Sequence, residues 1–380
     1  MNKIIKFLSL FAITVALAGC ETTNDSNSTS QSEIVDSSSF ESVDSSNSIE
    51  SSSSSVSSID DTEYTTFIDL EDVYIEIGET YSLKNALYNY SSTFVASKNI
   101  NIAGYNTKTQ QIFGLSVGST YFVLTYKDQK QKLNVTVSEP GTYSATFKFD
   151  RPRLEDKNLV AFGDSVTADA TLQGQGKTYV TLFAEKYGMN LLKNYAIGGT
   201  TATYMYLGSN IAKEYGNNKT ALDGCRVVKN AVDNGEIDEV DYAFIAYGHN
   251  DQYFQPPITD IGDDTNNINS FASCISYKGS YRYMINKLRS ANPNIRIILL
   301  NCTYSEYDKT NPSPYGNKYN YTDYRNATKD IAEEKSCKYV DPWDYMKDYF
   351  DYQDSKTYYK DSVHLSGTGH KKLSDYLFTC

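Results

Sequence analysis

The sequence is short of basic residues, cysteine and histidine, and each shortage excludes a class of protein. Its 380 residues contain 35 Lys and Arg against 47 Asp and Glu, a formal net charge of −12. A nucleic-acid binder needs a basic face to replace phosphate counterions, so this charge argues against one. Six Cys are too few for a disulfide scaffold of this size. The hydrophobic fraction of 40% is enough for folded cores.

The three histidines, His249, His364 and His370, do not combine with Asp or Glu at the spacing of a metal site. No motif for a cofactor is present either. We therefore expect neither a metal nor a cofactor.

Long hydrophobic runs are also missing, except at the N-terminus. Met1–Lys6 is basic, Phe7–Ala18 is almost wholly apolar, and Leu17-Ala18-Gly19-Cys20 follows. The run is too short to span a bilayer core of about 30 Å comfortably. The ending resembles the bacterial lipoprotein box, which implies that residues 1–19 are a signal peptide and that Cys20 carries a lipid. We expect a protein anchored on the extracellular face of the bacterial membrane; the alternative is an ordinary secreted protein.

Serine and acidic residues dominate the next segment, residues 20–62. Positions 21–60 hold 18 Ser, eight Asp or Glu and no Lys or Arg. Such a segment cannot bury enough apolar surface to offset the entropy of the chain. We predict a disordered tether.

Residues 63–139 contain short runs in which apolar and polar residues alternate, with no helical period. This pattern predicts an all-β sandwich. Ile112–Thr120 and Leu133–Val137 resemble parts of the bacterial Ig-like group 2 domain. Such modules space or adhere, and both roles stay open. Residues 140–157 are a linker, in which the alternation over Tyr143–Phe149 predicts a linking strand.

Apolar runs and helical patterns alternate through residues 158–380. The strands are expected at Leu159–Phe162, Leu191–Ile197, Val240–Tyr247, Ile295–Leu300 and Lys338–Val340. The helices are expected near Tyr179–Tyr187, Leu222–Asn234, Tyr277–Ala291, Tyr324–Lys335 and Gly367–Leu377. This order predicts an α/β fold, a three-layer α/β/α sandwich around a central parallel sheet. Binding sites in such sheets form beyond the carboxyl ends of the strands.

Four short motifs follow the predicted strands or close the chain. They are Gly163-Asp164-Ser165, Gly198-Gly199, Gly248-His249-Asn250-Asp251 and Asp361-Ser362-Val363-His364. A serine needs a base within hydrogen-bond reach to become a nucleophile. That base needs an acceptor on its other nitrogen, and Asp361 lies three residues before His364. Together the motifs indicate a nucleophile, a base and an orienting carboxylate.

Donors aimed at a developing oxyanion complete such a site. The candidates are the N–H groups of Ser165 and Gly199 and the side-chain amide of Asn250. His249, between the third motif's Gly and Asn, either touches substrate or fills space.

These four motifs, in this order, resemble the blocks of the SGNH hydrolases, also called the GDSL esterase/lipase family. The resemblance covers about residues 158–380 and implies a flavodoxin-like sheet, with Ser165, Asp361 and His364 as the catalytic triad. It also implies Ser165, Gly199 and Asn250 as the oxyanion hole. The second block often reads Ser-Gly in the family, so the Gly198-Gly199 pair leaves the choice of glycine open by one position.

The loops that should overhang the site are rich in tyrosine. Residues 304–321 hold five Tyr and no run of Leu, Ile or Val that could wall an acyl tunnel. An open rim of tyrosines and polar side chains suits a sugar, although the rings could equally pack the loops. We expect a serine esterase that removes short acyl groups, acetyl above all, from an acylated polysaccharide. The alternatives are a GDSL lipase or phospholipase and a non-catalytic surface adhesin; the only membrane partner expected is the one reached by the lipid anchor.

Overall fold

The computed structural model describes residues 63–380 apart from 144, 204–222, 260–273, 311–312, 314 and 352–354. The expected signal peptide, Cys20 and the tether lie outside the described residues. No helix in the described ranges is long and apolar enough to cross a membrane.

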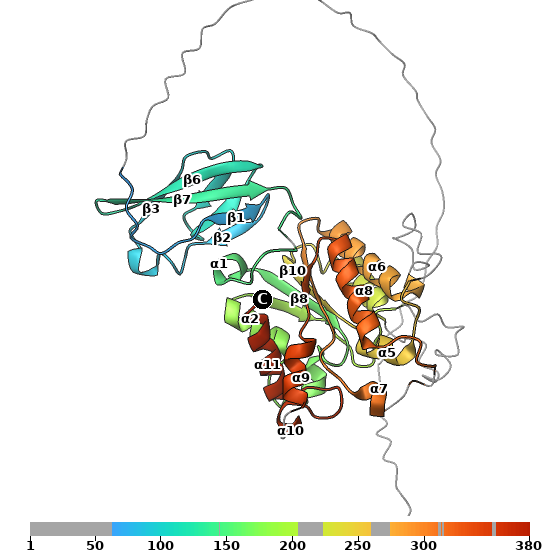
Figure 1. The fold of residues 1–380 in the computed structure, drawn as a ribbon. Helices are drawn as coiled ribbons and strands as arrows, with labels where there is room; N and C mark the ends of the chain where they lie inside the picture. The colour runs from blue at the N-terminus through green and yellow to red at the C-terminus, as the bar shows by residue number, and fades with distance from the viewer. Residues whose placement is uncertain are drawn as a thin grey trace, which may run out of the picture. The chain divides into compact units, whose positions relative to one another are not determined.

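The N-terminal part is built from strands alone, apart from the short η1 (Tyr88–Tyr90) (Figure 1). Its strands are β1 (Val73–Glu76), β2 (Thr80–Ser82), β3 (Phe94–Ser97), β4 (Ala103–Asn106), β5 (Gln111–Gly114), β6 (Gly118–Tyr126) and β7 (Gln129–Ser138). They form one sheet in the order β1-β7-β6-β3 and another in the order β2-β5-β4. Alternate residues of β7, Leu133, Val135 and Val137, are buried in a core to which both sheets contribute. The prediction of an all-β region is confirmed, and its likeness to an Ig-like domain stays a prediction.

The predicted strand over Tyr143–Phe149 is wrong. These residues pair with no strand in the part of the chain that the structure describes. Phe147 and Phe149 are instead buried in the core of the following α/β part, and the Lys338 ammonium donates to the carbonyl of Phe147 at 2.8 Å. The alternation of apolar residues therefore reflects two buried rings and not a ladder of backbone hydrogen bonds.

A five-stranded sheet forms the centre of the C-terminal part. Its strands are β8 (Asn158–Gly163), β9 (Asn190–Asn194), β10 (Tyr242–Ala246), β11 (Arg296–Leu300) and β12 (Lys338–Val340). They are all parallel and lie in the order β12-β11-β10-β8-β9. This is the flavodoxin-like order, in which the connection reverses direction between β8 and β10. The carboxyl ends of these two neighbouring strands therefore frame the expected site.

Helices cover both faces of this sheet (Figure 1). One face packs against α4 (Gly224–Asp233), α6 (Tyr277–Ala291) and α8 (Tyr321–Glu334). The other packs against α2 (Tyr179–Tyr187), α9 (Trp343–Phe350) and α11 (Gly367–Leu377). Successive strand residues alternate between the two cores, as Val160 and Ala161 do. The three-layer α/β/α prediction is confirmed.

Short helices connect these elements. They are α1 (Arg151–Leu154), η2 (Asp169–Leu172), α5 (His249–Phe254), α7 (Tyr307–Thr310) and α10 (Ser355–Tyr358).

Buried charges join the N-terminal strands to the α/β part. Glu79, next to β2, accepts from the guanidinium group of Arg153 at 2.8 Å and forms an ion pair with Arg296 at 3.2 Å. Arg296 also pairs with Glu76 of β1 at 2.7 Å. All four side chains are more than nine-tenths buried. Such charges are tolerated in a dry interior only while each keeps its partner.

Candidate active site

Ser165 lies two residues after β8, where the chain leaves the sheet. A side chain on Gly163 would come within 2.6 Å of the Thr167 hydroxyl and 2.8 Å of the Ala246 carbonyl, so only glycine fits this tight exit. The carboxylate of Asp164 accepts from the N–H of Val166 at 2.9 Å and closes the turn behind the serine. The turn therefore holds Ser165 at the carboxyl end of the sheet and leaves its side chain half-buried.

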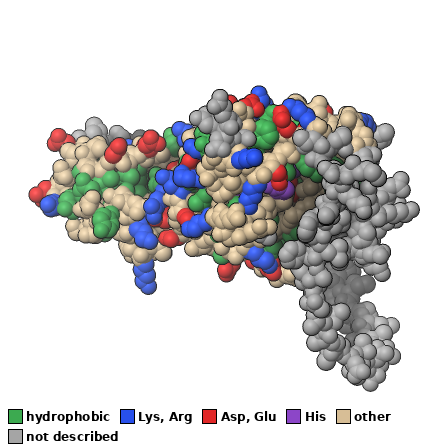
Figure 2. Space-filling view, turned by 90° about the horizontal axis from the view of Figure 1, so that it is seen from below, with side chains coloured by type: hydrophobic (Ala, Val, Ile, Leu, Met, Phe, Trp, Pro, Cys, Tyr) green, Lys and Arg blue, Asp and Glu red, His purple; other side chains and the backbone are tan. Residues whose placement is uncertain are grey.

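Three of the predicted residues come together in one hydrogen-bonded row. Ser165 Oγ lies 2.8 Å from His364 Nε2, and His364 Nδ1 lies 2.7 Å from Asp361 Oδ2. The loop that carries His364 and Asp361 is closed by a bridge between Tyr359 and Leu365. His364 is the one histidine of three that is not buried, and Figure 2 shows a histidine side chain at the surface.

The Asp361 carboxylate is fully engaged by its own loop. Besides the imidazole, it accepts from the backbone N–H groups of Val363 at 2.9 Å and His364 at 2.7 Å. Partial burial by itself would raise the pKa of Asp361, but these hydrogen bonds outweigh it and lower that pKa to about 2. Asp361 is thus a carboxylate at any working pH and fixes a proton on His364 Nδ1, which leaves Nε2 to accept from Ser165.

Two of the predicted oxyanion donors are backbone N–H groups in the turns after β8 and β9. The N–H groups of Ser165 and Gly199 have no acceptor among the described residues. Gly199 has a φ of +80°, as the third residue of a type II turn requires, and the Thr200 N–H closes that turn on the Ile197 carbonyl at 3.4 Å. Gly198 is also near, since a Cβ there would lie 3.6 Å from Ser165 Cβ. The choice between the two glycines therefore stays open.

Two side chains of the third motif form hydrogen bonds with the chain that follows Gly199. Asn250 donates from its side-chain amide to the Thr200 carbonyl at 2.9 Å. Asp251 is fully buried and accepts from the N–H groups of Ala202 at 2.9 Å and Thr203 at 3.2 Å. Burial raises the pKa of Asp251 to about 6 against the effect of these hydrogen bonds. The third motif includes Asp251, but nothing in the sequence indicates this anchoring role.

His249 is buried among aromatic and hydroxyl side chains. Its residue is 6% exposed, and its ring lies edge-on to Tyr321 at 5.6 Å. Burial, and then the nearby His364, lower the pKa of His249 to about 3, so the imidazole is neutral. This burial fits the space-filling alternative, and a direct contact of His249 with substrate stays a prediction.

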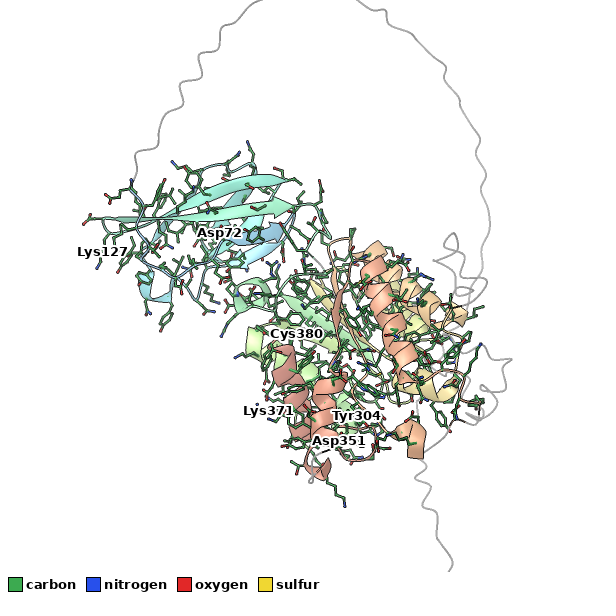
Figure 3. The ribbon with its side chains drawn as sticks, viewed as in Figure 1. Asp72, Lys127, Tyr304, Asp351, Lys371 and Cys380 are labelled. Carbon is green, nitrogen blue, oxygen red and sulfur yellow. The ribbon has the colours of Figure 1, made fainter. Side chains whose placement is uncertain are left out.

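Some tyrosines of residues 304–321 are buried, and others are partly exposed. Tyr304, labelled in Figure 3, and Tyr321 are buried against Trp343 of α9, with ring centroids 5.0 Å and 5.1 Å apart. Tyr307 stays half-exposed, 5.7 Å from the ring of Tyr253 on α5. The segment is thus partly structural packing, and Tyr307, with Tyr253 beside it, is partly exposed.

The described residues contain no cluster of three His, Cys, Asp or Glu that could hold a metal ion. His370, apart from the site, accepts from the N–H of Tyr179 at 3.3 Å within the core.

Comparison with known proteins identifies the α/β part. The sequence model of the GDSL-like Lipase/Acylhydrolase family matches residues 161–372. A search of curated proteins found no match. A solved structure from Lactobacillus plantarum is 17% identical, with a TM-score of 0.43, over 60% of this chain and 96% of its own.

Two further solved structures carry functional descriptions. A lipase/acylhydrolase from Enterococcus faecalis is 16% identical, with a TM-score of 0.38, over 59% of this chain and 94% of its own. A variant of an acetyl xylan esterase from Geobacillus stearothermophilus is 18% identical, with a TM-score of 0.37, over 60% of this chain and 95% of its own.

Proposed function

Because the chain belongs to the GDSL-like lipase/acylhydrolase family, we propose that it is a serine esterase that removes short acyl groups, acetyl above all, from a polysaccharide. One observation carries the proposal. The row from Ser165 Oγ through His364 to Asp361, at 2.8 Å and 2.7 Å, is the arrangement that activates a serine. A surface adhesin built on this fold would have no need of it.

The reaction follows from this row. Ser165 Oγ bonds to the ester carbonyl carbon while His364 Nε2 takes the hydroxyl proton, and Asp361 stabilises the imidazolium. The N–H groups of Ser165 and Gly199 face the oxyanion, with the Asn250 amide as the third donor. The carbon–oxygen bond to the sugar breaks as His364 returns the proton to the sugar oxygen. Water then attacks the acyl-enzyme, His364 relays its proton to Ser165 Oγ, and the carboxylic acid leaves.

The surroundings of the serine favour a polar substrate. Thr171 donates to the Ser165 carbonyl at 2.5 Å, and the Lys360 ammonium donates to the Thr171 carbonyl at 2.9 Å. The half-exposed Tyr253–Tyr307 pair completes the rim. An aromatic face beside hydrogen-bonding groups suits a sugar ring, whereas a long acyl chain would need an apolar wall.

A fluorophosphonate probe and a substrate panel test this function. The probe should label Ser165 in the wild type, and Ser165→Ala should lose both label and activity. Ser290→Ala, an exposed serine on α6, is the matched control and should keep both. Acetyl esters should turn over faster than decanoyl esters, and an acetylated glycan should release acetate. Faster turnover of decanoyl esters with no release from any glycan would favour the lipase alternative, and absence of labelling would favour the adhesin.

We further propose that Cys20 is lipidated and that residues 21–62 hold the enzyme away from the membrane surface. The lipoprotein-like Leu17–Cys20 ending and the serine-rich composition that follows support this. A Cys20→Ala protein should appear in the culture medium, while Cys380→Ala should stay in the membrane fraction. A Cys20→Ala protein that remains in the membrane fraction would contradict the anchor.

A further inference from the structure

His249 is a buried imidazole to which the esterase reaction gives no role. It is the first residue of α5, which follows β10 closely. Gly248 precedes it, and the candidate oxyanion donor Asn250 follows it. Its Nδ1 lies 3.5 Å from the Tyr321 hydroxyl, and its Nε2 lies 3.3 Å from the Thr303 hydroxyl. Both ring nitrogens are thus paired with groups that can either donate or accept.

The contacts continue from Tyr321 to the loop that carries the triad. The Tyr321 hydroxyl donates to Ser305 Oγ at 3.3 Å. Ser305 Oγ in turn donates to the carbonyl of Ser362 at 2.8 Å. Ser362 lies between Asp361 and His364, so a chain of three side chains connects the Asn250 motif to the Asp361–His364 loop.

The Ser362 carbonyl at the end of this chain sets the direction of every hydrogen bond in it. A carbonyl only accepts, so the single proton of Ser305 is used on Ser362. Ser305 must then accept from Tyr321, and the single proton of Tyr321 is used in turn. The Tyr321 oxygen can therefore only accept from His249, which places the proton on Nδ1. The other nitrogen, Nε2, accepts from the hydroxyl of Thr303.

We propose that His249 is a positioning residue that holds the oxyanion motif and the triad loop in register through Tyr321 and Ser305. This inference rests on the proposed esterase function. The candidate oxyanion donors belong to the turns after β8, β9 and β10, whereas His364 and Asp361 come from a loop near the C-terminus. A fixed connection between them keeps the base aligned with the hydroxyl and the donors, and an error of about 1 Å in such a site can cost about 10²-fold in rate.

Paired variants test this role. His249→Leu and Tyr321→Phe should each lower kcat by roughly tenfold or more with KM little changed, because the geometry of the reacting groups changes and not the rim that holds substrate. The double variant should lose little more than either single variant, since both break the same connection. His249→Asn, whose amide can donate from near the Nδ1 position, should recover part of the rate, and His249→Gln should not.

Thr303→Val is the matched control. Thr303 is as buried as His249 and bonds to its other nitrogen, but it lies outside the chain to Ser362. It should lower thermal stability and keep kcat near the wild-type value. The rate of fluorophosphonate labelling of Ser165 gives a second readout for every variant. Wild-type kcat and labelling rate in His249→Leu and Tyr321→Phe, or an equal loss in Thr303→Val, would overturn the positioning role. Absence of labelling in the wild type would instead overturn the proposed function itself.

Discussion

Replacing Asp361 by Asn tests the proposed triad with a change of almost no volume. Asp361 Oδ1 accepts from the backbone N–H groups of Val363 and His364, so the amide oxygen of Asn should keep that position. The amide nitrogen then faces His364 Nδ1, which now lies 2.7 Å from a carboxylate oxygen. Two donors cannot share this contact. The imidazole proton is expected to move to Nε2, which then cannot accept from Ser165.

The expected losses differ for stability and for rate. Partial burial opposes ionisation, but the hydrogen bonds lower the pKa of Asp361 from 3.8 to about 2. At 1.36 kcal/mol per unit this corresponds to about 2.4 kcal/mol of folding stability. The side chain is 53% exposed, so screening by solvent reduces this stability term to about 1 kcal/mol. The rate loss comes from the blocked tautomer, and we expect kcat to fall on the order of 10³-fold.

The assay is kcat on an acetyl ester, with the free energy of unfolding measured in parallel. Asp128→Asn, an exposed residue between β6 and β7, removes a charge without touching the site and should keep the wild-type rate. An Asp361→Asn enzyme with kcat within tenfold of the wild-type value would refute the reasoning. Neither the charge of residue 361 nor the tautomer of His364 would then matter for the rate. Stability should also report Asp361: its contribution is present above the unfolded pKa and is lost as the pH falls from about 4 towards 2.

Three other variants separate the contribution of the site from that of the scaffold. Asn250→Ala should lower kcat on an acetyl ester by on the order of 10²–10³-fold if its amide stabilises the oxyanion; a loss confined to KM would contradict that role. Glu79→Gln leaves the buried Arg153 with only the more exposed Asp150, at 3.9 Å, as an anion and should cost about 3 kcal/mol in chemical denaturation. Lys84→Ala, which removes an ion pair with Asp156 that is 56% exposed on both sides, should cost less than about 1 kcal/mol. Equal costs for the two changes would contradict the importance of burial.

Regular elements were predictable wherever the pattern is local. The helices expected at Tyr179–Tyr187, Tyr277–Ala291 and Gly367–Leu377 have those bounds in the structure, because each presents apolar residues at helical spacing to one face. The strand expected over Tyr143–Phe149 does not form. Alternation of apolar residues shows which side chains lie on the same side of the chain. A strand also needs a second strand to pair with, and the local sequence does not show whether one is available.

The candidate triad was predictable because its motifs occur together. Ser165, Asp361 and His364 each stand in a block of three or four residues that is weak alone, and the order of the blocks along a parallel sheet explains why they meet at one edge. The roles of the tyrosines in residues 304–321 were harder to predict. Tyr304 and Tyr321 pack on Trp343 while Tyr307 stays partly exposed beside Tyr253, and nothing in their spacing distinguishes them.

The alternation of apolar runs and helical patterns was enough to predict the α/β order of the C-terminal part and the all-β region before it, and the motifs named a candidate nucleophile, base and carboxylate. The contacts of His249, by contrast, depend on the folded arrangement. Its partners Thr303 and Tyr321 come from the connection after β11 and the start of α8. Polar residues in such connections follow no periodicity, and their contacts depend on which strands are neighbours in the sheet. Hydrogen bonds in a dry interior are set by that proximity and by the need to pair every buried donor, and neither is written in local sequence.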